Sequence, residues 1–225
     1  MTAALSAAIL SMSGSAPAAK RAPKKHTRSV GCRVAFRLGK TVLADAQAGV
    51  FALQGDYLGC WFPSPRVAVV LGPSNNSNVS GQGGFRLNDF AVNGSTAAYF
   101  SLSENGLGDA YQVVVVDLRQ RRFLARFPTG QLSQSQLAPL PAMGVSVIGV
   151  GPTTGVVVTA SGGVAWIVHD TQAPDAPTYQ VWKANRGSAP TMLAAGNDID
   201  PSSLALGGAT LYWSQGGSAH SSSLS

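Results

Sequence analysis

The stretch YQVVVVDLRQRRFLARF, residues 111–127, predicts two β-strands joined by a polar turn. Its four consecutive valines, Val113–Val116, form the continuous β-branched run that is typical of a strand in a sheet covered on both faces. The polar segment Leu118–Arg122 then returns the chain into a second strand that begins at Phe123. We therefore expect this hairpin to lie deep in the protein.

Two further strands, residues 85–92 and 97–103, precede this hairpin. The four segments together predict one antiparallel meander, which is the composition of a propeller blade. The chain as a whole supports this class of structure, because its 225 residues include 26 glycines and 13 prolines but only 12% charged residues. Such a composition favours an all-β protein with many turns.

The start of this unit recurs along the chain as a turn with glycine followed by an apolar strand that usually contains an aromatic residue. The four occurrences have their glycines at Gly49, Gly94, Gly163 and Gly208. The first pair and the last pair are each 45 residues apart, whereas 69 residues separate the middle pair. Repeats of about 40–50 residues built from short strands predict a β-propeller.

The number of blades depends on the segment between the second and third units. Residues 145–150 are strand-like, and they form either an additional hairpin or the first strand of the third unit, with residues 156–160 as the second. We expect four blades of four antiparallel strands. Five blades and a β-sandwich are the alternatives.

The fourth unit contains three expected strands, at residues 203–206, 211–213 and 219–224. The segment Val34–Leu38 stands before the first unit and belongs to no complete set, so we expect it to supply the missing strand. Pairing of the two ends of the chain in one blade would remove the open sheet edges of an unclosed ring.

Two parts of the sequence resemble known proteins. The segment Val113–Leu118 followed by Arg122–Leu124 resembles the blade repeats of bacterial exported propeller proteins. The segments GNDIDPSSLALGGATL and YWSQGG, within residues 196–217, resemble a C-terminal segment of uncharacterised secreted actinobacterial proteins. The resemblance covers about residues 31–225 and implies an exported β-propeller. Its motifs are structural, so it transfers no catalytic residue.

The net charge of +6 belongs to one short segment. Eight of the 16 basic residues lie at or before Lys40, and the first of the ten acidic residues is Asp45. Residues 41–225 therefore carry eight basic and ten acidic side chains, a net charge of −2. A net charge of −2 on residues 41–225 disfavours a general nucleic-acid-binding groove, because such a groove needs many lysines and arginines on the folded surface.

The beginning of the chain predicts export. Residues 1–19 contain an apolar stretch followed by small residues, as in a secretory leader, although the basic start of such a leader is missing. Residues 20–30 then form a basic linker, and residues 31–225 form the propeller domain. No later stretch has the length of a membrane span. The two cysteines, Cys32 and Cys60, predict a disulfide, and the expected location is secreted or cell envelope.

Catalytic motifs are weak in this sequence. A GxSxG nucleophile motif does not occur among its 225 residues, and its three histidines lie in unrelated contexts. We predict no catalytic, metal or cofactor site. The residues that we expect to contact a ligand or partner are the basic turn and the end of one strand: Arg119, Arg121, Arg122, His169 and Asp170.

We therefore expect a monomeric, exported, non-catalytic propeller that binds a protein or an envelope polymer. One alternative is a propeller-type glycosidase or polysaccharide lyase that uses clustered aspartates. Another alternative is a structural protein that its basic segment, Lys20–Arg28, tethers to anionic wall polymer.

Overall fold

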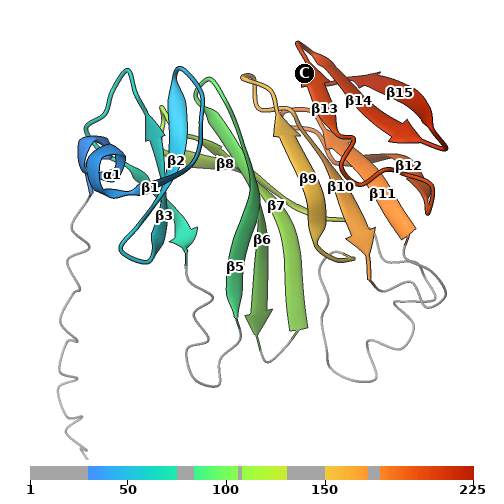
Figure 1. Ribbon diagram of the computed structural model, residues 1–225, viewed down its shortest axis with the longest axis horizontal. Helices are drawn as coiled ribbons and strands as arrows, with labels where there is room; N and C mark the ends of the chain where they lie inside the picture. The colour runs from blue at the N-terminus through green and yellow to red at the C-terminus, as the bar shows by residue number, and fades with distance from the viewer. Residues whose placement is uncertain (1–29, 75–83, 106–107, 131–149, 172–177) are drawn as a thin grey trace, which may run out of the picture.

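The structure, a computed structural model, describes residues 30–74, 84–105, 108–130, 150–171 and 178–225. In these ranges the protein is all-β, with one short helix and four antiparallel sheets (Figure 1). The expected leader of residues 1–19 and nearly all of the linker of residues 20–30 lie outside the described residues. The one helix in the described residues is too short to cross a membrane.

Each sheet contains strands that follow one another in the chain. The first sheet follows the helix α1 (Cys32–Leu38) and contains β1 (Lys40–Ala44), β2 (Ala48–Leu53), β3 (Asp56–Trp61) and β4 (Val69–Pro73). The second contains β5 (Phe85–Asn93), β6 (Thr96–Asn105), β7 (Gly108–Asp117) and β8 (Arg122–Pro128). The third contains β9 (Thr153–Val158), β10 (Val164–Asp170), β11 (Thr178–Ala184) and β12 (Thr191–Gly196). The fourth contains β13 (Ala205–Gly207), β14 (Thr210–Gln215) and β15 (Ser218–Ser223).

The predicted repeat corresponds to these sheets. The apolar strands that recur along the chain are β2, β6, β10 and β14, which are the second strands of the four sheets. All four strands expected in the second unit and all three expected in the fourth are present. The first strand of the third sheet is β9, so the count of four units is confirmed for the described residues. Residues 145–149 lie outside them.

One detail of the repeat was wrong. Gly49 lies inside β2, opposite Cys60 on β3, and not in a turn. The first hairpin turns instead at residues 45–47, where the carboxylate of Asp45 accepts hydrogen bonds from the backbone N–H groups of Gln47 and Ala48, both 2.7 Å long. An aspartate can close a turn through its own side chain, so glycine is not needed there.

Burial on both faces explains the valine run of β7. Val114 and Val116 face a core shared with the first sheet, whereas Val113 and Val115 face a core shared with the third. Successive side chains of a strand point to opposite faces, so a strand between two layers must be apolar at every position. β10 has the same pattern, because Trp166 faces the second sheet and Ile167 faces the fourth.

The expected strand Val34–Leu38 was wrong, because these residues belong to the helix α1. Cys32 and Ala35, three positions apart, are buried against the first sheet, together with Phe51 of β2 and Cys60 of β3. A helix brings residues three positions apart to one side. The helix therefore covers the outer face of the first sheet, on the side opposite the second sheet.

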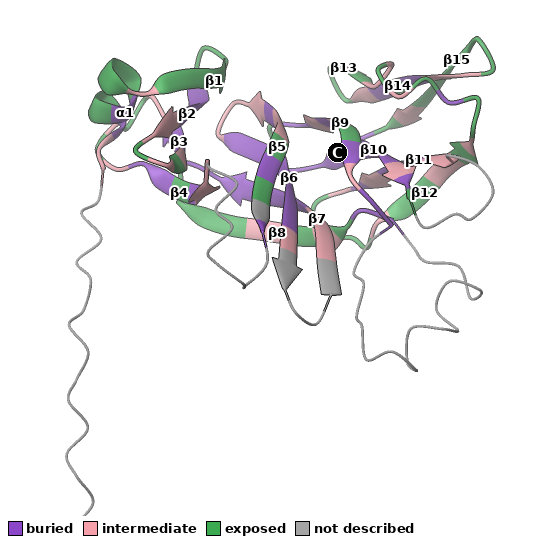
Figure 2. Ribbon diagram, turned by 60° about the horizontal axis from the view of Figure 1, so that its bottom comes forward, coloured by how far each residue is buried: buried purple, intermediate pink, exposed green. Residues whose placement is uncertain are grey.

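The expected pairing of the two ends of the chain is also not observed. Phe36 lies beside Phe51 and Phe62 in the first sheet, whereas Leu224 is buried between the third and fourth sheets. Within the described residues, β13–β15 pair in ladders only with one another. Figures 1 and 2 show α1 and β15 at opposite ends of a row of sheets that does not close.

Neighbouring sheets touch along their first strands, since β1 contacts β5, β5 contacts β9 and β9 contacts β13. Hydrogen bonds between the first hairpins support this order. The N–H of Gly94 donates to the Asp45 carboxylate over 2.8 Å, and the Thr96 hydroxyl donates to the carbonyl of Ala160 over 3.0 Å. The first hairpins of the first three sheets therefore lie along one edge of the row.

Candidate functional site

The hollow at the α1 end of the row is the best candidate for a binding site. It has a volume of about 350 Å³ and is lined by Cys32, Arg33, Phe36, Arg37, Phe62 and Pro65. Ligand pockets occupy about 300–1,000 Å³ and are mostly apolar with a few polar groups, so both its size and its lining suit a small ligand. The apolar lining comes from the helix and from the segment that links β3 to β4.

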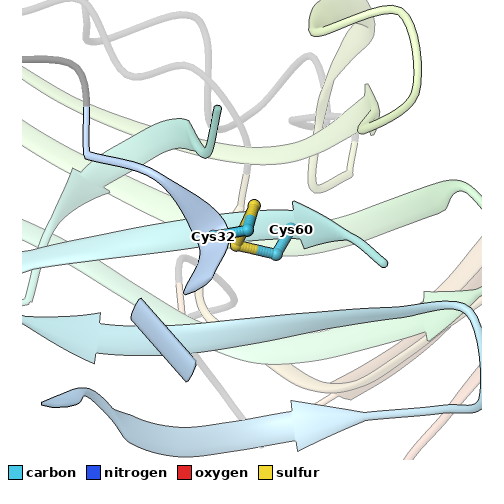
Figure 3. The surroundings of a disulfide bond; sticks show 2 residues. All are labelled: Cys32 and Cys60. Atoms are coloured by element: carbon cyan, nitrogen blue, oxygen red, sulfur yellow. A yellow bond between two sulfur atoms is a disulfide. The ribbon is translucent and has the colours of Figure 1, made fainter. Parts of the chain in front are cut away.

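Covalent and aromatic contacts hold the walls of this hollow. The predicted disulfide is present and joins Cys32 of α1 to Cys60 of β3, with 5.5 Å between the two Cα atoms (Figure 3). The ring of Phe36 meets the rings of Phe51 and Phe62 edge-on, with centroids 6.0 and 6.3 Å apart. The helix is thus attached at its first residue by a covalent bond and beyond it by packing.

A second hollow of about 460 Å³ adjoins the first, because both are lined by Arg33 and Pro65. Gly31 and Arg66 complete its lining. The guanidinium groups of Arg33 and Arg66 are exposed, and arginine binds carboxylate and phosphate groups through paired N–H donors. The two hollows together therefore place an apolar wall beside an arginine pair.

The arginines that the sequence singled out lie in the turn between β7 and β8 and at the start of β8, and they have different neighbours. The guanidinium of Arg119 lies over the ring of Trp61 in the first sheet, 5.4 Å from its centroid. Arg121 occupies the left-handed turn position that precedes β8, with φ of 56°. Arg122 instead lines a hollow that β8 shares with Arg186 of the third sheet. All three arginines are exposed, and their known contacts differ.

The hollow beside Arg122 is smaller than a usual ligand pocket. Its volume is about 200 Å³, and its walls come from β8 and from the turns at Gly162 and Gly187. Phe123 is partly exposed, and the guanidinium of Arg126 lies over its ring, 5.0 Å from the centroid. We therefore prefer the hollows at α1 as the candidate site.

The predicted pair His169 and Asp170 also points in two directions. His169 stacks on Tyr179, with ring centroids 5.1 Å apart, on the face of β10 toward the fourth sheet. Asp170 is buried on the opposite face, where Gln180 donates a 3.1 Å hydrogen bond to its carboxylate. Gln180 in turn accepts a 2.8 Å hydrogen bond from the indole N–H of Trp182. Asp170 therefore belongs to a hydrogen-bonded chain in the core.

Asp89 is a residue that the sequence did not single out as unusual. It has a left-handed backbone, with φ of 49°, at a register shift of β5. Its carboxylate accepts hydrogen bonds from Thr153 of β9 and from Asn88, 2.5 and 3.0 Å long. Burial raises the pKa of Asp89 above its usual value, although both hydrogen bonds act in the opposite direction. An aspartate with a left-handed backbone costs conformational energy, which the contact with Thr153 offsets.

Two other aspartates, at turns, have structural contacts. Asp117 accepts a 2.8 Å hydrogen bond from the N–H of Gln120 in the turn before β8. The exposed Asp200 accepts from the N–H and hydroxyl of Ser202, and these bonds lower the pKa of its carboxyl group. Three histidine, cysteine or acidic side chains do not come together anywhere in the described ranges as a metal site would require.

Comparison of the chain with known protein families, with curated proteins and with solved structures finds no match. The assignment of a site therefore depends on the geometry above.

Sequence reasoning missed the α1 site because it assigned residues 34–38 to a strand. The signal was nevertheless present. Cys32 and Ala35 have helical spacing, and glycines at positions 31 and 39 bound the segment. The segment was assigned to a strand because the fourth unit lacked one, but Val34, Phe36 and Leu38 lie in a helix and are exposed.

Proposed function

We propose that the protein is an exported, non-catalytic, monomeric binding module of the β-propeller type, and that its α1 end binds an amphipathic acidic ligand. The single observation that carries this proposal is the apolar hollow of about 350 Å³ with Arg33 at its junction with a second hollow. An apolar chain would lie against Phe36 and Phe62, and an acidic group would meet Arg33 and Arg66.

The succession of sheets supports the propeller part of the proposal. Each sheet is an antiparallel meander, and the first strands of successive sheets contact one another. Blades of a propeller have this relationship to their neighbours. The four sheets would then form an arc of such a propeller, with α1 covering the outer face of the first sheet.

The disulfide supports export. Cys32 and Cys60 are both buried and form the only cysteine pair of the chain. Disulfides persist in oxidising compartments and are rare in reducing ones. At a secreted or envelope location, the proposed amphipathic acidic ligand could be a lipid or a fragment of one.

Binding of a soluble amphipathic anion tests the proposed function. We expect laurate, used below its critical micelle concentration, to bind the full chain, and we expect dodecanol to bind more weakly because it lacks the carboxylate. The variant Arg33→Gln should weaken laurate binding about tenfold, because it removes a charge-assisted hydrogen bond. Isothermal titration calorimetry measures both affinities.

The matched control is Arg86→Gln, which removes an exposed arginine from β5 in the second sheet. It should leave laurate binding unchanged. Equal affinity of the native chain, Arg33→Gln and Arg86→Gln for laurate would contradict the assignment of the site to α1.

A further inference from the structure

Exposed apolar side chains gather at the α1 end of the protein. Nine large hydrophobic residues are exposed in the described part of the chain, and five of them belong to α1 and β1: Val34, Phe36, Leu38, Val42 and Leu43. Leu38 and Phe36 are 71% and 66% exposed, more than any other large apolar residue described. Figure 2 shows both elements in the colour of exposed residues. Exposed apolar side chains that concentrate at one end of a protein are a feature of interaction sites.

The same end carries the positive charge of the protein. Arg33, Arg37 and Lys40 are exposed among the apolar residues. Five more basic residues precede them in the sequence, and the first acidic residue is Asp45. The charge of Asp45 faces the turn that it closes and Gly94. An occupant of this surface must therefore combine an apolar interior with negative charge.

We propose that α1 and β1 dock onto a lipid bilayer that contains anionic lipids. The basic side chains would meet the negative headgroups, and Val34 and Leu38, which lie one turn apart on the same side of α1, would enter the boundary between headgroups and acyl chains. A hydrophilic anionic polymer would attract the charges but would leave the apolar side chains in water. The combination of exposed apolar side chains and arginines on α1 therefore selects a bilayer over a wall polymer.

The attachment of α1 to the first sheet keeps its apolar side chains exposed to solvent. The disulfide fixes Cys32 to β3, and Ala35 is fully buried against the first sheet. Rotation of the helix to bury Leu38 would expose Ala35 and strain the link at Cys32. In β1, a register shift between Thr41 and Leu43 inserts Val42, and every residue of the strand is exposed. The apolar surface is thus a stable feature of the fold.

This inference deepens the proposed function, since it names the surface that the α1 end meets. The two proposals share Arg33 and Arg37, but the apolar side chains that would enter the bilayer are different. Val34 and Leu38 do not line either hollow at α1. Substitutions at these residues therefore test membrane docking while they leave the hollow unchanged.

Sedimentation of the full chain with vesicles tests the docking. We expect binding to vesicles of phosphatidylcholine and phosphatidylglycerol at a ratio of about 7:3, at least tenfold tighter than to phosphatidylcholine alone. The double variant Val34→Ser/Leu38→Ser should lose at least tenfold in affinity for the anionic vesicles. Arg37→Gln should reduce the affinity and its dependence on salt.

The matched control is Met192→Ser/Tyr212→Ser, which changes two exposed apolar residues of the third and fourth sheets. It should bind the anionic vesicles like the native chain. Thermal melts establish that each variant is folded.

Three results would overturn the inference. The first is unchanged vesicle binding by Val34→Ser/Leu38→Ser, which would assign binding to the basic leader alone. The second is equal binding to neutral and anionic vesicles. The third is a concentration-dependent dimer that this variant disrupts, without vesicle binding, which would make a second copy the occupant. Laurate binding that persists in any of these cases leaves the hollow at Arg33 intact as the ligand site, so the two proposals fail separately.

Discussion

The carboxylate of Asp45 accepts a 2.8 Å hydrogen bond from the backbone N–H of Gly94, 49 residues away in the chain. The other oxygen of the same carboxylate accepts from Gln47 and Ala48 in its own turn. One side chain thus closes the first hairpin of the first sheet and fastens it to the first hairpin of the second. The order of the sheets therefore depends on polar contacts between turns as well as on the apolar cores.

We expect Asp45→Ala to lower the free energy of unfolding by about 1–2 kcal/mol, because it leaves three backbone N–H groups without this acceptor. Urea denaturation measures the loss. Asp56→Ala, which changes an exposed aspartate in the next hairpin, should stay within about 0.5 kcal/mol of the native chain. Equal losses in the two variants would show that Asp45 does not link the sheets.

Removal of the disulfide should lower the free energy of unfolding by about 3–4 kcal/mol, because the bond restrains a loop of 28 residues in the unfolded chain. Thermal melts of the native chain with and without reductant measure this effect. The variant Cys32→Ser/Cys60→Ser is the control, since reductant should leave its melting temperature unchanged. A native chain that melts at the same temperature under both conditions would contradict the prediction.

Asp89 should make the protein less stable as the pH rises. Burial raises its pKa in the folded state above the unfolded value. Its stabilising contribution is therefore fully present below the unfolded pKa and is lost as the pH rises through the folded pKa. Asp89→Asn should remove this pH dependence and raise the neutral-pH stability by less than about 1 kcal/mol, because solvent screens the partly exposed group.

The control for this prediction is Asp89→Ala. Alanine offers no acceptor to Thr153 and tolerates the left-handed backbone less well than asparagine, so this variant should be less stable than Asp89→Asn. Urea denaturation at several pH values compares the three proteins. An Asp89→Asn variant with the pH dependence of the native chain would assign that dependence to other groups.

Arg119 should act as a structural residue. Its guanidinium lies over the ring of Trp61, and we expect Arg119→Ala to cost about 0.5–1 kcal/mol of stability through the loss of this cation–π contact. Arg122→Ala, in the same basic segment, should stay within about 0.5 kcal/mol of the native chain. Urea denaturation of the two variants distinguishes them, and a larger loss for Arg122→Ala would reverse the assignment.

The valine run of β7 and the repeated second strands were predictable because burial on two faces leaves a local record. A strand between two layers must be apolar at consecutive positions, so Val113–Val116 indicated its own environment. Cys32 and Cys60 were similarly informative, because a chain with two cysteines allows one pairing. These features can be predicted because they depend on the types and order of neighbouring residues or on the composition of the chain.

The helix α1 and the candidate site were not predictable in the same way. The apolar residues Val34, Phe36 and Leu38 alternate as they would on one face of a strand. The helix becomes evident only from the packing of Cys32 and Ala35 on the first sheet. The hollow at Arg33 likewise requires Phe62 and Pro65, which the chain brings to α1 after two hairpins.

The sequence by itself therefore determined the all-β class, the four-part repeat, the disulfide and the concentration of positive charge near the N-terminus, because each is a property of local order or composition. The tertiary structure decided that the row of sheets stays open in the described residues, that Arg119 and Arg122 face different neighbours, and that Phe36 and Leu38 are exposed. These relationships depend on which surfaces meet across long separations in the chain, and the apolar packing between whole sheets selects them.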